Sequence, residues 1–145
     1  MKLRIAWIGR TREPAIQSLT AGYVERLARY APTDSYEFAG EAALLKHVAK
    51  SSPRPLLILL DLRGKQLSSE DLAHFLEDHQ NRGTPLLMFA IGPADGFSDQ
   101  ARAIAGFQLS LGKMTLAHEL ARVVLLEQLY RAFTILKGHP YHLGH

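Results

Sequence analysis

The chain has 145 residues, of which 47% are hydrophobic and 21% charged, and its formal net charge is +3. This predicts one globular domain over residues 1–145, with a mild basic bias that is compatible with an RNA partner. Because the chain has no cysteine and no run near the roughly 18 apolar residues of a membrane span, we exclude thiol chemistry and a membrane partner and expect a cytoplasmic location.

The first half of the chain alternates strand and helix patterns. The apolar run in the opening MKLRIAWIG is too short for a signal peptide and predicts a strand over residues 3–8. A helix is predicted over residues 14–29, with Pro14 near its first turn, where a missing N–H costs nothing. A short strand over residues 35–38 and a helix over residues 41–50 follow.

Two strongly apolar segments then frame a helix. Residues 56–60 are continuously apolar, which is typical of a central parallel strand buried on both faces. Ser68 is the predicted N-cap of a helix that ends near Gln80, with acidic residues favourably placed in its first turn. The segment PLLMFAIG, residues 85–92, repeats the buried-strand pattern.

The last elements continue the alternation. Ser98 is the predicted N-cap of a helix that ends near Ala105, and a strand over residues 107–111 precedes a helix over residues 117–136. Regular alternation of this kind predicts an α/β fold with a mainly parallel sheet and helices on both faces.

Three glycine-bearing loops follow predicted strands, where parallel sheets bind ligands. They are LDLRGK after Leu60, IGPADGFS after Ala90 and LGKMTLAH after Leu109. Any one of them alone is typical of an ordinary turn, whereas three together predict one composite small-molecule pocket. The glycines concerned are Gly64, Gly92, Gly96 and Gly112.

Neither common phosphate-binding motif is present. Five residues separate Gly106 from Gly112, where the motif G-x-x-x-x-G-K-[ST] has four, and Met114 stands in place of its Ser or Thr. The segment IGPADG likewise lacks G-x-G-x-x-G. A plain nucleotide-binding protein is therefore disfavoured.

Other chemistry-bearing side chains have ordinary interpretations beside the functional ones. Asp61 and Asp95 are candidate acid–base groups at strand ends or simply solvated loop carboxylates. Trp7 is expected in the core. Three histidines of the tail could bind zinc, but their spacing near a chain end is weak evidence, and we expect no metal. They are His139, His142 and His145.

The helix predicted over residues 117–136 is apolar on nearly every side. Its charged residues form no continuous polar face, although Glu127 and Arg131 are spaced for an i,i+4 ion pair. A helix that is apolar all round must be buried all round, which predicts a homodimer through this helix. The alternative is that the first helix or the C-terminal tail covers its outer flank.

Several motifs resemble one known family. LDLRGKQLSSEDLA, FAIGPADGFS and LSLGKMTLAHELARVVLLEQLYRAFTILKGHPYH occur in the order and spacing of the RlmH family of SPOUT methyltransferases. That family methylates N3 of a pseudouridine in large-subunit (23S) ribosomal RNA. The resemblance covers most of the chain, including MKLRIAWIG. It is most specific over roughly the last fifty residues, where the run 114–132 is hard to match by chance.

The resemblance implies a SPOUT fold with a C-terminal deep trefoil knot that binds S-adenosyl-L-methionine, and a homodimer that acts on ribosomal RNA or the assembled ribosome. Small residues would allow the backbone close to the cofactor. The cofactor contacts it implies are Leu60, Gly92, Leu111, Gly112, Lys113, Met114, Thr115 and Leu116.

For catalysis, the resemblance implies a role for the C-terminal pair Tyr141 and His142 in positioning the base or relaying the N3 proton. Arg122 and Arg131 are expected near the dimer cleft, where they could meet RNA phosphate or the target base. Methyl transfer itself needs little beyond in-line positioning.

The chain departs from the family pattern in three places. Pro93 replaces a glycine, the ending Leu143-Gly144-His145 replaces a basic residue, and the segment 40–55 is shorter and lacks a charged helix-loop. These departures affect ribosome docking more than cofactor binding. They leave two alternatives: a SPOUT methyltransferase of another RNA such as tRNA, and a non-catalytic RNA- or ribosome-binding module of the same fold.

Overall fold

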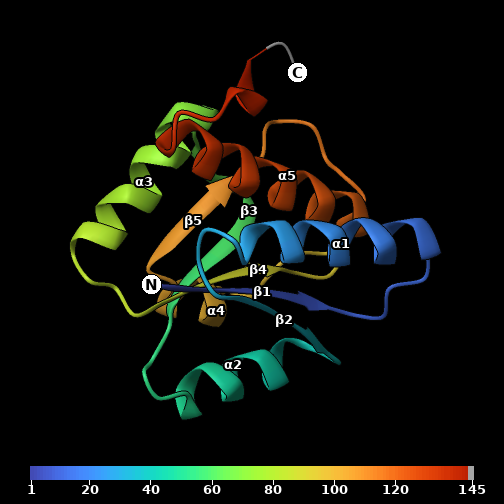
Figure 1. Cartoon of the computed structure of the whole chain (residues 1–145). Coiled ribbons are helices and arrows are strands. Elements are labelled where there is room, and N and C mark those ends of the chain that lie inside the picture. The colour runs from blue at the N-terminus through green and yellow to red at the C-terminus, as the bar shows by residue number, and fades with distance from the viewer. Residues whose placement is uncertain (144–145) are drawn as a thin grey trace.

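The computed structural model describes residues 1–143 and contains one five-stranded sheet (Figure 1). Its strands are β1 (Lys2–Ile8), β2 (Thr33–Phe38), β3 (Leu56–Gln66), β4 (Leu86–Ile91) and β5 (Phe107–Ser110). The helices are α1 (Pro14–Leu27), α2 (Glu41–Lys50), α3 (Ser69–Asn81), α4 (Asp99–Ile104) and α5 (His118–Leu136), followed by a 3₁₀ turn (Pro140–His142). The strand order is β2-β1-β4-β3-β5, and every pairing is parallel, which confirms the predicted α/β class.

Helices cover both faces of the sheet because alternate side chains of each strand point to opposite sides. Ile5 and Phe89 belong to the core beneath α1, α3 and α5, whereas Ala6 and Met88 belong to the core beneath α2 and α4. All four side chains are fully buried. Figure 1 shows the same division, with α1, α3 and α5 above the sheet and α2 and α4 below it.

The predicted helix caps are confirmed. The hydroxyl of Ser68 accepts a 3.0 Å hydrogen bond from the Asp71 N–H, and the Asp71 carboxylate accepts one of 3.2 Å from the Ser68 N–H. This reciprocal pair fixes the start of α3. The hydroxyl of Ser98 accepts from the Ala101 N–H and fixes the start of α4.

The prediction of a loop directly after Leu60 is wrong. The segment after Leu60 does not leave the sheet, because β3 continues to Gln66 and pairs with β5 again at Lys65. The register shifts between Leu60 and Lys65, so residues 61–64 form an irregularity within the strand rather than a strand-exit turn. Gly64 makes the second pairing possible, since a Cβ atom there would lie 2.7 Å from the carbonyl of Gln108.

Most of the apolar surface of α5 is covered within the chain. The helix lies on the sheet between α1 and α3 (Figure 1), and the tail folds back so that the ring of Tyr141 lies 4.8 Å from that of Tyr130. The first turns of the helix are the exception, because Leu120 is 53% exposed and Val124 is also exposed. Within the described residues, no helix is long and apolar enough to cross a membrane.

Candidate functional site

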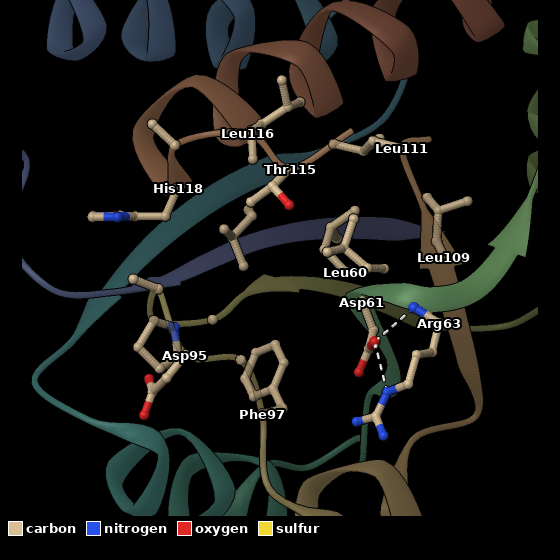
Figure 2. Close-up of a pocket in the computed structure, with 18 of the residues that line it drawn as sticks. Leu60, Asp61, Arg63, Asp95, Phe97, Leu109, Leu111, Thr115, Leu116 and His118 are labelled. Carbon is tan, nitrogen blue, oxygen red and sulfur yellow. Dashed lines mark hydrogen bonds and ion pairs between the residues drawn. The ribbon is translucent and has the colours of Figure 1, made fainter. Parts of the chain in front are cut away.

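A cavity of about 710 Å³ opens at the carboxyl ends of β4 and β5, beside the irregular part of β3 (Figure 2). Its walls come from the irregular part of β3, the β4–α4 loop, the β5–α5 loop and the first turns of α5. This volume lies within the usual range for small-molecule sites, and most of the lining is apolar. The topology of a parallel sheet therefore brings segments that are far apart in the sequence to one site.

The cavity gathers nearly all the residues that the resemblance assigned to the cofactor. Those that line it are Leu60, Gly92, Leu111, Gly112, Met114, Thr115 and Leu116. Lys113 is exposed and does not line the cavity. Asp61, Asp95 and Pro93 line it as well.

Two glycines shape this cavity in different ways. Gly92 is buried, and a Cβ atom there would lie 2.9 Å from the ring of Phe97, which forms part of the wall. Gly112 has φ +138°, a conformation that side chains strongly disfavour, and nothing lies within 4 Å of its Cβ direction. Gly92 thus maintains tight packing, whereas Gly112 permits the turn of the β5–α5 loop.

Asp61 is the best-connected carboxylate in the cavity. Its Oδ1 accepts a 2.8 Å hydrogen bond from the Arg63 N–H, and its Oδ2 lies 3.5 Å from Nη1 of Arg102. Burial alone would raise the pKa of Asp61, but the Arg63 N–H and the two guanidinium groups hold it below its usual value. Asp61 is therefore a fixed anion rather than a proton donor at neutral pH.

Arg102 connects two walls of the cavity, the irregular part of β3 and the β4–α4 loop. Besides Asp61, its guanidinium donates to the Phe97 carbonyl and pairs with Asp99. The β4–α4 loop is therefore tied to the irregular part of β3. Phe97 and His118 belong to two of the loops predicted to form the pocket, and both line the cavity. No sequence pattern marked Arg102 as a site residue, because it belongs to the site only through tertiary contact.

Tyr141 and His142 lie away from the cavity of their own chain. Neither lines it, and Tyr141 instead packs on Tyr130, with the Arg131 guanidinium 5.3 Å from its ring centre. Nδ1 of His142 lies 2.8 Å from the His139 carbonyl oxygen. Burial, followed by a hydrogen bond with Tyr23, raises the pKa of Tyr141 to about 12. Tyr141 therefore remains a neutral phenol at neutral pH, able to donate a hydrogen bond but not to act as a base.

Arg122 is buried within its own chain. Its side chain is 1% accessible, and its guanidinium lies 3.8 Å above the ring of Trp7, which is itself buried as expected. Nη1 donates a 2.7 Å hydrogen bond to Oγ1 of Thr11, while Nε and Nη2 have no hydrogen-bond partner within the described residues. Burial lowers the pKa of Arg122, against the attraction of Glu119. Arg131, by contrast, forms the predicted ion pair with Glu127.

The tail histidines form no metal cluster in the described part of the chain. No group of three His, Cys, Asp or Glu residues between residues 1 and 143 could hold a metal ion. Nδ1 of His139 instead accepts from the Tyr141 N–H and caps the 3₁₀ turn. His145 lies outside the described residues.

Comparisons with known proteins agree with this geometry. Residues 1–142 match a family described as "Predicted SPOUT methyltransferase". The chain is 57% identical to the "Ribosomal RNA large subunit methyltransferase H" of Koribacter versatilis, covering 100% of both chains, and 43% identical to the protein of the same name from Trichlorobacter lovleyi, covering 98% of this chain and 99% of that one.

A solved structure is similar in fold. It is the SpoU methyltransferase AviRb from Streptomyces viridochromogenes in complex with the cofactor AdoMet, with a TM-score of 0.50 and 13% sequence identity. The similarity covers 88% of this chain and 56% of that one, and at this identity it shows the fold alone.

Proposed function

The chain belongs to the SPOUT methyltransferase family, and from this premise we propose that it uses S-adenosyl-L-methionine to methylate N3 of a pseudouridine in large-subunit ribosomal RNA. The observation that carries the proposal is the cavity at the carboxyl edge of the sheet. It collects all the cofactor contacts implied by the family resemblance except Lys113. An enzyme with this substrate would work in the cytoplasm, where ribosomes are.

The residues present suit such a cofactor. The apolar walls, including Leu60, Leu111 and Leu116, offer a surface for adenine, and Gly112 lets backbone amides approach it without a side chain between. Asp61 supplies one fixed negative charge for a hydrogen-bond donor or a cation. S-adenosylmethionine supplies the activated methyl group when bound, so the protein's task is to position the base and remove its N3 proton.

For the proton, we propose that Tyr141 orients the base while His142 accepts or relays the proton. The raised pKa keeps Tyr141 a neutral phenol, which can donate a hydrogen bond to the base but does not take part in proton transfer, and this supports the division of roles. We assign Arg122 an indirect contribution, since its guanidinium is buried beneath the loop that contains Thr11.

We further propose that the complete site needs two copies of the chain. Tyr141 packs at the level of Tyr130, whereas the cavity reaches α5 at Ala121, nine residues earlier, or about 14 Å along the helix. A two-fold partner could bring its own tail to this cavity. The exposed apolar side chains beside the cavity support a homodimer there, and they are Met114, Leu116, Leu120 and Val124.

The C-terminal trefoil knot belongs to the same proposal. It is supported by family membership and by the similarity in fold to AviRb. In the proposed arrangement, the β5–α5 loop, residues 111–117, is the knotted backbone around the cofactor, and α5 is the shared wall of the dimer.

The test of the function is transfer of labelled methyl from S-adenosylmethionine to ribosomes that lack the modification, with free large-subunit RNA and tRNA alongside. Digestion of the RNA would locate the label. Label on N3 of a ribosomal pseudouridine supports the proposal, and label on tRNA alone would redirect it to the alternative substrate. RNA binding without label, from protein that binds the cofactor, would favour the non-catalytic module.

The two-copy site has its own test. Gly112→Val should lose the cofactor, and His142→Ala should lose proton transfer. Mixing the two inactive variants should restore about a quarter of wild-type activity, since half of randomly formed dimers are mixed and each has one complete site. No recovery, from mixtures shown to exchange subunits, would contradict a site shared between copies.

A further inference from the structure

We propose that the β1–α1 loop, residues 9–13 (Gly-Arg-Thr-Arg-Glu), is a docking element for RNA backbone phosphates at the margin of the cofactor cavity. The inference rests on the proposed function, because it concerns how the RNA substrate is held. It adds a surface that neither the family motifs nor the cavity contains.

The loop lies beside the cavity. It leaves β1 directly after Ile8, and the preceding Trp7 pairs with Ile91 of β4, the strand that continues into the cavity wall at Gly92. On its other side, the loop contacts Glu119, which lies in the first turn of α5 between two residues that line the cavity. Figure 1 shows this loop at the same end of the molecule as the start of α5.

The backbone of the loop is held firmly from beneath. Oε1 of Glu119 accepts a 2.7 Å hydrogen bond from the Arg12 N–H and a longer one, 3.5 Å, from the Glu13 N–H. The Arg12 N–H is the largest cause that lowers the pKa of Glu119, so this carboxylate stays charged and the contact persists at neutral pH. Arg122 adds its hydrogen bond to the Thr11 hydroxyl.

The loop held by these hydrogen bonds exposes two unpaired guanidinium groups to solvent. Arg10 and Arg12 are exposed, and neither side chain has a hydrogen-bond or ion-pair partner among residues 1–143. Arg4, Arg102 and Arg131, in contrast, each pair with a carboxylate of the chain. Arginine forks match the geometry of phosphate oxygens, and a preorganised backbone reduces the ordering cost of binding.

The buried Arg122 places a further cation beneath the loop. It has no carboxylate within ion-pair distance, and two of its N–H-bearing nitrogens have no partner in the described structure. Stacking on Trp7 offsets part of the cost of burying this charge. A buried cation without an ion-pair partner is unfavourable for stability alone, and it would gain from a polyanion bound above the loop.

Phosphate is favoured over other partners by this arrangement. The loop offers charge and hydrogen-bond donors but no apolar anchor, since its residues are Gly, Arg, Thr, Arg and Glu. Such contacts fix the register of a nucleic acid without reading its bases. The loop would therefore hold the backbone flanking the target nucleotide, while the cavity and the Tyr141–His142 pair act on the base.

The experiment measures RNA affinity as a function of salt for Arg10→Ala/Arg12→Ala. The probe is a large-subunit RNA fragment that carries the target pseudouridine. The control is Arg54→Ala/Arg82→Ala, which removes the same charge from two exposed positions. These positions precede β3 and β4, at the amino ends of the strands and so at the end of the sheet opposite to the cavity. Cofactor affinity and melting temperature are measured for both double variants. The backbone contact to Glu119 survives in the first variant, because it uses the Arg12 N–H.

We expect the loop variant to lose RNA affinity about tenfold and its log–log salt slope to fall by about 1.4, or about 0.7 for each phosphate contact on single-stranded RNA. Cofactor affinity should be unchanged, and Arg10→Lys/Arg12→Lys should keep most of the slope. Wild-type affinity and slope in the loop variant, or an equal loss in the control, would overturn the inference.

Failure of the proposed function would look different. Wild-type protein would then transfer no methyl group or bind no cofactor, while the comparison of the two double variants would still report whether this loop binds RNA phosphate.

Discussion

Gly64→Ala tests the least expected feature of the fold, the return of β3 to β5 beyond the cavity. A Cβ atom at this position would lie 2.7–2.8 Å from backbone atoms of Gln108 and Leu109. Ordinary contacts begin near 3.4 Å, so the strands would have to separate by about 0.7 Å. A flexible side chain could move aside, but a paired strand backbone cannot. We therefore expect a loss at the upper end of the usual overpacking range, about 3 kcal/mol.

The assay is urea unfolding, with cofactor affinity measured in parallel. Because residues 61–63 and Leu109 line the cavity, separating the strands should weaken cofactor binding as well. Gly22→Ala is the matched control, since Gly22 lies within α1 and nothing lies within 4 Å of its Cβ position. This change should stabilise the protein by about 0.5–1 kcal/mol. A loss below about 0.5 kcal/mol for Gly64→Ala would refute the strand return.

Three further changes probe the cavity, a half-buried histidine and a helix cap. Gly112→Val should abolish cofactor binding because it places a side chain in the cavity wall at φ +138°, and unchanged affinity by calorimetry would contradict the placement. Burial, and then the nearby Arg4, lower the pKa of His47 below 6.5 in the folded protein. As the pH falls, the histidine is therefore protonated in the unfolded chain before it is protonated in the folded one. Stability should fall from about pH 7 to about pH 5, and this slope should be smaller in His47→Gln. Ser68→Ala should cost about 1 kcal/mol in thermal unfolding through loss of the α3 cap, and an unchanged melting temperature would contradict it.

Local patterns predicted the elements because they depend on near neighbours in sequence. The runs at β3 and β4 are apolar on both faces, and Ser68 and Ser98 are good N-caps. β4, α3 and α4 were therefore predicted close to their observed bounds, and β3 was predicted from its correct first residue. The continuation of β3 was missed because Asp61 to Gln66 carries charge and glycine, which is typical of a turn. Only contact with β5, more than forty residues away, makes it a strand.

The candidate site divides in the same way. The glycine-bearing loops after β4 and β5 were recognised in the sequence, and their residues around Gly92 and Gly112 line one cavity as expected. Arg102 could not be predicted from the sequence, because its role is to connect Asp61 of β3 with the Phe97 carbonyl of the β4–α4 loop. The expectation that Arg122 lies near a dimer cleft stays a prediction. Its burial over Trp7 beneath the β1–α1 loop is a tertiary contact that helical spacing does not encode.

The apolar pattern of α5 leads to a final expectation about assembly. Periodicity indicated that every side of the helix needed a cover, but α1, α3 and the tail supply most of it. The uncovered part is confined to Leu120 and Val124 in the first turns, next to Met114 and Leu116 of the cavity wall. A second copy seated there would touch the cavity rather than the far end of the helix, so association and cofactor binding should be coupled. Dilution below the dimer dissociation constant should weaken cofactor affinity, and Leu120→Asp should do the same at any concentration. Cofactor affinity that stays constant while sedimentation shows monomers would place the interface elsewhere.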